Sequence, residues 1–111
     1  MSTSHPKLQV TSTAIHDVLI IEPKVFGDER GWFTESFNAN DFASATGLDV
    51  QFLQDNHSFS RQWTLRGMHY QLNPIAQTKF IRVLSGTILD VVLDIRKGSP
   101  TYGKHYSIEL S

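Results

Sequence analysis

Short apolar runs and polar turns alternate along most of the chain, a pattern typical of β-strands. Pro23 ends the first apolar run, and the two-residue connection Ser85-Gly86 predicts a hairpin between the segments on either side of it. Several short strands joined by turns predict an all-β sandwich, jelly roll or barrel. The strands that the pattern predicts cover residues 18–21, 32–37, 50–56, 64–71, 78–84, 87–95 and 105–110.

One short helix is predicted near residues 39–46. Asn38 or Asn40 can cap its first turn, because an amide oxygen there accepts a hydrogen bond from a free backbone N–H group. Phe42 and Ala45 lie three residues apart and can face a core, and Gly47 can end the helix.

The first residues are rich in serine and threonine. We expect residues 1–16 to form a loose arm, to which Leu8 and Val10 could add an edge strand, and residues 17–111 to belong to the folded domain. A jelly roll generally needs about eight strands, and the pattern supplies seven at most. We therefore expect either that another chain completes the sheet or that this sequence is the front part of a longer protein.

Composition limits the classes of function. The chain has 111 residues with 40% hydrophobic residues and a formal net charge of -1, which favours one packed domain and gives no general attraction for nucleic acid or an anionic membrane. It has no cysteine, which excludes disulfides, thiolate zinc sites, iron–sulfur clusters and a cysteine nucleophile. Since no signal-like or membrane-spanning apolar run is present, we expect a cytoplasmic protein.

The segment around Gln54 and Asn56 is the first candidate for chemistry. In a strand these amides share a face with Val50 and Phe52, so we expect them to point into a concave interior. Buried amides need hydrogen-bond partners, which the edge of a nucleobase or a sugar could supply. An internal hydrogen-bond network explains the same pattern equally well.

The second candidate combines Arg66 and His69. Three residues apart in a strand, they should lie on opposite faces, but a bulge at Gly67 would bring them to one side. Arg66 could then hold a phosphate beside an imidazole that titrates near neutral pH. From spacing alone, a surface or core histidine is the favoured interpretation of His69.

The third candidate is Lys79, which shares a strand face with Ile81 and Val83. Such a lysine can stabilise a developing oxyanion, or its ammonium group can simply reach out to solvent. The carboxylates of Asp90 and Asp94 are interpreted as solvent-facing or capping groups.

Other chemistries have little support. His57 and His69 could meet across strands, but two ligands are too few for a metal site. The sequence contains no glycine-rich phosphate loop and no Gly-x-Ser-x-Gly turn around a nucleophile.

Several blocks of sequence, in order and spacing, resemble those of the dTDP-4-dehydrorhamnose 3,5-epimerases. They include Asp28-Glu29-Arg30-Gly31, Gln54-Asp55-Asn56-His57-Ser58 and Leu65-Arg66-Gly67-Met68-His69-Tyr70-Gln71, and the likeness covers nearly all of residues 17–111. The resemblance implies a cupin-type jelly roll that works as a homodimer without a metal or an organic cofactor. It also implies proton exchange at C3 and C5 of a 4-keto-6-deoxy sugar attached to dTDP, in deoxysugar biosynthesis.

The resemblance also implies roles for individual residues. His69 matches the base, and Lys79 matches the residue beside the 4-keto oxygen. The implied substrate contacts are Arg30 and Arg66 at the diphosphate, and Glu35, Gln54, Asp55 and Asn56 at the nucleoside.

Two departures from the family pattern leave the activity open. Thr78 stands where the family usually has glycine before the lysine. The family's proton-donor tyrosine and the aspartate that pairs with the base have no counterpart in residues 1–111. Alternatives are therefore a mono-epimerase or ketoisomerase on the same nucleotide sugar, or a dTDP-sugar-binding fragment without catalysis.

Overall fold

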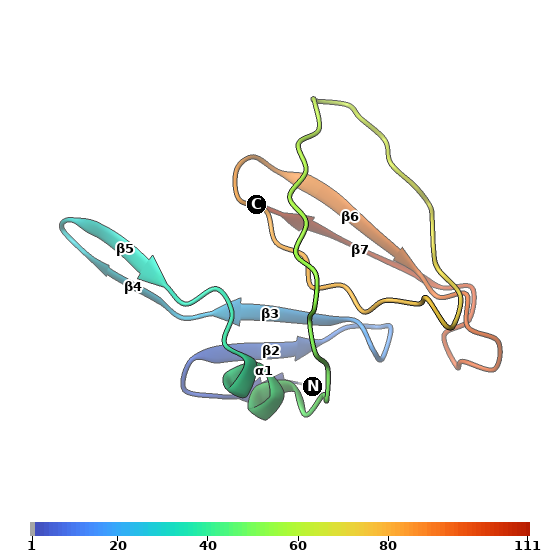
Figure 1. The fold of residues 1–111 in the computed structure, drawn as a ribbon, viewed down its shortest axis with the longest axis horizontal. Helices are drawn as coiled ribbons and strands as arrows, with labels where there is room; N and C mark the ends of the chain where they lie inside the picture. The colour runs from blue at the N-terminus through green and yellow to red at the C-terminus, as the bar shows by residue number, and fades with distance from the viewer. Residues whose placement is uncertain (1) are drawn as a thin grey trace. The chain divides into compact units, whose positions relative to one another are not determined.

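A computed structural model describes residues 2–111, with side chains from His5 onward. The chain forms two compact units, of which one comprises the residues up to Asp49 together with Arg82–Ser111, and the other comprises Val50–Ile81. The first unit holds every described strand and the one described helix (Figure 1). No helix in the described residues is long and apolar enough to cross a membrane.

Three antiparallel strands form the N-terminal sheet, in the order β1–β2–β3. They are β1 (Ser2–Ser4), β2 (Leu8–Ser12) and β3 (Leu19–Pro23). The strand expected around Leu8 and Val10 is present, but it is the central strand rather than an edge strand. Its pairing with both neighbours corrects the expectation of a loose arm, because those ladders satisfy its backbone N–H and C=O groups. The predicted boundary between residues 1–16 and a domain of residues 17–111 stays a prediction.

The helix α1 (Ala39–Thr46) confirms the prediction in detail. The side-chain oxygen of Asn38 accepts a hydrogen bond from the backbone N–H of Asp41 at 3.1 Å, so Asn38 rather than Asn40 is the cap. Gly47 ends the helix in the left-handed conformation (φ 71°), and its N–H donates to the carbonyl of Ala43.

The small core of the first unit lies between α1 and β2. Phe42 and Ala45 on the helix are buried, as predicted, and so are Val10 on β2 and Ile15 in the turn that follows. The rings of Phe37 and Phe42 lie 5.8 Å apart in a tilted arrangement. Packing against the helix thus covers one side of the N-terminal sheet.

Two antiparallel hairpins complete the strands of the first unit. One joins β4 (Val25–Asp28) to β5 (Gly31–Thr34), and the other joins β6 (Ile88–Leu93) to β7 (His105–Leu110). They confirm the strands predicted at 32–37, 87–95 and 105–110, although β5 already ends at Thr34.

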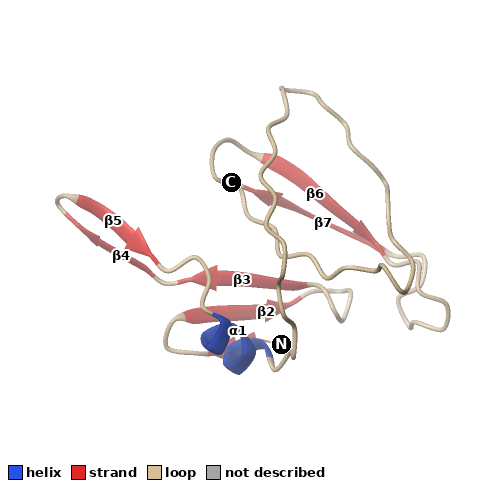
Figure 2. Ribbon diagram, in the orientation of Figure 1, coloured by secondary structure: helices blue, strands red, loops and turns tan. Residues whose placement is uncertain are grey.

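The strands predicted at 50–56, 64–71 and 78–84 are wrong for this structure. These segments carry no ladder hydrogen bonds, and Figure 2 shows residues 50–81 as loop throughout. Consequently Ser85-Gly86 joins no pair of strands, and the predicted hairpin is absent from the described residues. Apolar alternation alone does not make a strand, because a strand also needs a hydrogen-bonded neighbour.

A buried carboxylate organises the long connection from β6 to β7. Asp94 is only 4% exposed, and it accepts hydrogen bonds from the backbone and side chain of Arg96 at 3.0 Å and from the hydroxyls of Ser99 and Thr101 at 2.6 Å. Arg96 also pairs with Asp17, which lies 79 positions earlier in the chain. Asp94 is therefore a cap of its turn, not a solvent-facing group.

These bonds favour the ionised form of the carboxyl groups. The Arg96 guanidinium, with the Ser99 and Thr101 hydroxyls, holds the pKa of Asp94 well below its ordinary value. Hydrogen bonding from Arg96 lowers the pKa of Asp17 in the same way. Because the folded chain holds Asp94 ionised more firmly than the unfolded chain does, the bonds stabilise the fold most above the ordinary pKa of an aspartate.

Replacing the cap of α1 should weaken the fold measurably. We expect Asn38→Ala to lower the free energy of unfolding by about 1 kcal/mol, because the N–H of Asp41 loses its partner. Asn40→Ala is the matched control, since Asn40 lies exposed in the same turn and should change stability by less than about 0.5 kcal/mol. Urea unfolding followed by circular dichroism measures both, and equal effects would contradict the assignment of the cap.

Acid should remove the contribution of the ionised Asp94 carboxylate to the stability of the fold. We expect Asp94→Asn to have a lower melting temperature than the unaltered chain at pH 7. This difference in melting temperature should narrow as the pH falls below about 4. Asp90→Asn is the control, because Asp90 is half-buried on β6 and accepts no hydrogen bond from a side chain among the described residues. The same difference in melting temperature at pH 7 and pH 2.5 would contradict the stabilisation of the fold by the ionised carboxylate.

Candidate functional site

The residues that the sequence singled out fall into both units. The unit Val50–Ile81 carries most of them, and the hairpin β4–β5 and its continuation carry the other two. All eight side chains belong to exposed residues: Arg30, Glu35, Gln54, Asp55, Asn56, Arg66, His69 and Lys79.

The side chains of Gln54 and Asn56 contact each other. The Nε2 group of Gln54 donates a hydrogen bond to Oδ1 of Asn56 at 3.2 Å, as the two-residue alternation predicted. Both residues are exposed, so the expectation that they face a concave interior is wrong for this structure. The pair still offers free amide donors and an acceptor on one side of the chain.

Arg66 is oriented by a hydroxyl. Its Nε group donates to Oγ of Ser60 at 2.9 Å, which leaves the terminal guanidinium nitrogens to face solvent. Gly67 has a φ of 110°, a conformation that favours glycine, and the ring of His69 lies against it. No ladder surrounds Gly67, so the predicted bulge is absent, and no hydrogen bond joins Arg66 to His69 in the described part of the chain.

An aromatic contact brings two of the site segments together. The rings of Phe52 and Phe80 stack with centroids 5.8 Å apart and an interplanar angle of 29°. Phe80 follows Lys79, and Phe52 precedes Gln54 by two residues. The contact therefore places the backbone that carries the lysine beside the backbone that carries the amides, within the unit Val50–Ile81.

Arg30 sits at the tip of the β4–β5 hairpin and is paired with Asp28. Its terminal nitrogen lies 2.6 Å from Oδ2 of Asp28, and its backbone N–H donates to Oδ1 at 2.9 Å. Hydrogen bonding within the pair lowers the pKa of Asp28 and raises that of Arg30. Since Arg30 is largely exposed, a second anion can reach its remaining N–H donors.

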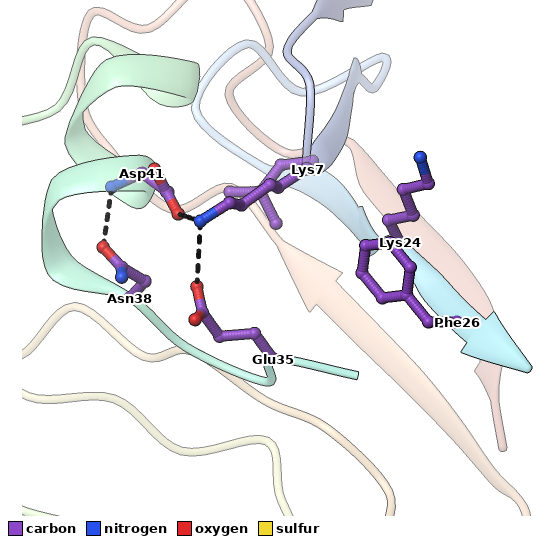
Figure 3. Close-up of a pocket in the computed structure, with 7 residues that line it drawn as sticks. Lys7, Lys24, Phe26, Glu35, Asn38 and Asp41 are labelled. Carbon is purple, nitrogen blue, oxygen red and sulfur yellow. Dashed lines mark hydrogen bonds and ion pairs between the residues drawn. The ribbon is translucent and has the colours of Figure 1, made fainter. Parts of the chain in front are cut away.

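Glu35 follows β5 and lies at the edge of a shallow hollow in the first unit. Figure 3 shows the hollow between the start of α1 and the segment that precedes β2, with Lys7 and Lys24 among its lining residues. The ammonium group of Lys7 lies 3.9 Å from Oε1 of Glu35 and 3.2 Å from Oδ2 of Asp41. The predicted nucleoside contact thus belongs to a small ionic cluster.

Sequence reasoning missed the partners of three site residues. Asp28 lies two positions before Arg30 in a turn bounded by glycines, a spacing that could have suggested the ion pair. Ser60 and Lys7 lie 6 and 28 positions from the residues they contact, and no local pattern points to them. No group of three or more His, Asp and Glu side chains that could hold a metal lies within the described residues, and the predicted independence from metals and cofactors stays a prediction.

Comparisons with known proteins agree on one family. The family described as dTDP-4-dehydrorhamnose 3,5-epimerase matches residues 12–111. A protein of that name from Shigella flexneri is 57% identical over 104 residues, which are 94% of this chain and 58% of the relative. One from Pseudomonas aeruginosa is 48% identical over 94% of this chain and 57% of its own length. The chain thus spans somewhat more than half the length of these relatives.

Solved structures give the same result for the fold. A dTDP-4-dehydrorhamnose 3,5-epimerase from Bacillus anthracis, with TDP and PPi bound, matches with a TM-score of 0.87 and 45% identity over 94% of this chain and 59% of its own. A dTDP-6-deoxy-D-glucose-3,5-epimerase from Legionella pneumophila, in complex with dTDP-4-keto-L-rhamnose, matches with the same score and identity over 94% of this chain and 55% of its own.

The fold class is therefore that of the cupin-type epimerases, as the sequence predicted. The chain belongs to the dTDP-4-dehydrorhamnose 3,5-epimerase family.

Proposed function

We propose that this protein epimerises C3 and C5 of dTDP-4-keto-6-deoxyglucose to give dTDP-4-keto-L-rhamnose, in the biosynthesis of dTDP-rhamnose. The observation that carries the proposal is the 45% identity and the TM-score of 0.87 to the Legionella pneumophila epimerase, whose structure contains dTDP-4-keto-L-rhamnose. The family resemblance also assigns roles to eight residues of this chain, from Arg30 to Lys79.

Removal of a proton next to the ketone is the step that these residues support. A hydrogen on C3 or C5 is weakly acidic because the 4-keto group can take up the charge as an enolate. In the proposal the imidazole of His69 takes this proton, and the ammonium group of Lys79 stabilises the oxygen of the enolate. His69 can return its proton only to the face from which it took it, so inversion at each carbon needs a proton from a second acid on the opposite face of the sugar ring. The family resemblance gives this role to a tyrosine that has no counterpart in residues 1–111.

Recognition of the nucleotide is assigned to the remaining residues. Arg66, with its terminal nitrogens turned to solvent, and Arg30, with donors beyond its bond to Asp28, would bind the diphosphate. The paired amides of Gln54 and Asn56 would bind the nucleoside, together with Asp55 and Glu35.

A homodimer and a cytoplasmic location belong to the same proposal. The β4–β5 hairpin supports the dimer, because four large apolar side chains in it are more than half exposed: Val25, Phe26, Trp32 and Phe33. Exposed apolar surface of this kind is typical of protein contacts. A second copy of the chain would cover it next to Arg30.

Substitution of the base should separate catalysis from binding. We expect the unaltered chain in deuterium oxide to replace the C3 or C5 proton of dTDP-4-keto-6-deoxyglucose with deuterium, and His69→Asn to abolish this exchange. Affinity for dTDP should stay within a few-fold, because asparagine keeps a polar group of similar size. Proton NMR of the sugar measures the exchange, and calorimetric titration with dTDP measures binding.

Arg66→Ala serves as the contrasting variant. It should weaken dTDP binding by at least about tenfold, since a charge-assisted phosphate contact is lost. Exchange at one carbon alone would favour a mono-epimerase or ketoisomerase. Tight dTDP binding without exchange by the unaltered chain would instead identify a dTDP-sugar-binding fragment, and loss of binding in His69→Asn would show that the histidine is structural.

A further inference from the structure

The ammonium group of Lys7 connects Glu35 to the helix α1. It lies 3.2 Å from Oδ2 of Asp41, in the first turn of α1, and 3.9 Å from Oε1 of Glu35. In Figure 3 a dashed line joins the Lys7 ammonium group to each of these two carboxylates. These contacts are ion pairs rather than hydrogen bonds, since Oδ2 of Asp41 has no hydrogen-bond partner among the described residues and 3.9 Å is too long for one. A single ammonium charge thus attracts both carboxylates.

The backbone holds Lys7 at a fixed point. Its N–H group donates to Nδ1 of His5 at 3.1 Å, and its carbonyl accepts a hydrogen bond from the N–H of Lys24 at 2.9 Å. The next residue, Leu8, begins the central strand β2. The side chain of Lys7 therefore starts from a backbone position that two hydrogen bonds and the sheet define.

Asp41 is the fixed end of the cluster. Its backbone N–H is bound by the cap residue Asn38, and its side chain is 22% exposed. Glu35 is the more open end, with a side chain that is 43% exposed and, in the described chain, no hydrogen bond to another residue. Glu35 thus keeps acceptor sites for a ligand while Lys7 restricts where its carboxylate can lie.

We infer that Lys7 is a positioning residue that anchors the Glu35 carboxylate to α1 through Asp41, so that Glu35 is in place for its nucleoside contact. This inference rests on the proposed function, which gives Glu35 that contact. Lys7 itself need not touch the ligand. Its effect on binding passes through Glu35 and disappears when Glu35 can no longer pair with a cation.

Lys24 offers a matched control in the same hollow. Its ammonium group lies over the ring of Phe26, 5.1 Å from the ring centre, and forms no ion pair with a described carboxylate within 4.0 Å. Lys24→Met removes the same charge from the same hollow as Lys7→Met does. A general effect of local charge on an anionic ligand would appear in both variants, whereas positioning of Glu35 would appear in Lys7→Met alone.

The test combines two readouts on the full chain labelled with carbon-13. The first is the side-chain carboxylate signal of Glu35 in NMR spectra, assigned through its loss in Glu35→Gln. The second is the affinity for dTDP of Lys7→Met, Glu35→Gln and the double variant. We expect Lys7→Met to shift the Glu35 signal and to weaken binding about threefold, the size typical of a partly exposed ion pair.

The double variant distinguishes positioning from a structural role. In the Glu35→Gln background, we expect Lys7→Met to weaken dTDP binding no further, although it still lowers the melting temperature by removing the pair with Asp41. An unchanged Glu35 signal in Lys7→Met, or equal weakening with and without Glu35, would overturn the inference. If the unaltered chain bound no dTDP, the proposed function would fail, and the carboxylate signal would still decide whether Lys7 holds Glu35.

Discussion

A β-strand needs a neighbour, and this requirement determines which parts of the chain are sheet. Every extended segment has backbone N–H and C=O groups that must be hydrogen-bonded to another strand or to water. In the first unit β2 finds partners on both sides, and β6 finds β7. In the unit Val50–Ile81 the chain forms loops and turns without a ladder, and its polar and apolar side chains alike are mostly exposed.

Both residues proposed for catalysis lie in the unit Val50–Ile81, where no strand is present. His69 and Lys79 come from stretches whose backbone has no ladder, held within their unit by side-chain contacts such as the stacking of Phe52 on Phe80. The proposed binding residues of the first unit sit on a paired hairpin or against a capped helix, so their carboxylates and guanidinium groups have defined partners. The proposed residues of the first unit thus stand on hydrogen-bonded backbone or beside a capped helix, whereas those of Val50–Ile81 depend on side-chain contacts such as the bonds from Gln54 to Asn56 and from Arg66 to Ser60.

The sequence predicted those features that depend on local patterns. The helix, its cap at Asn38 and its end at Gly47 follow from residue types within one or two turns, and they are confirmed. The alternation that places Gln54 and Asn56 on one side is also local, and their hydrogen bond confirms it.

Features that depend on distant partners were not predictable in the same way. Whether residues 64–71 become a strand depends on a neighbour that no local pattern identifies, and the burial of Asp94 depends on Arg96 together with Asp17 far upstream. The assignment of His69 as a base came from the family resemblance rather than from spacing, since a lone histidine in an extended segment has no intrinsic mark of catalysis.

Amide hydrogen exchange of the free chain, followed by NMR, tests the dependence of order on strand pairing most directly. The structure predicts slow exchange for hydrogen-bonded amides in β2, β3, β6, β7 and α1, and fast exchange across residues 50–81. Protection in residues 50–56 or 64–71 equal to that in β6 and β7 would contradict the account, because it would show that these segments already have hydrogen-bonded partners.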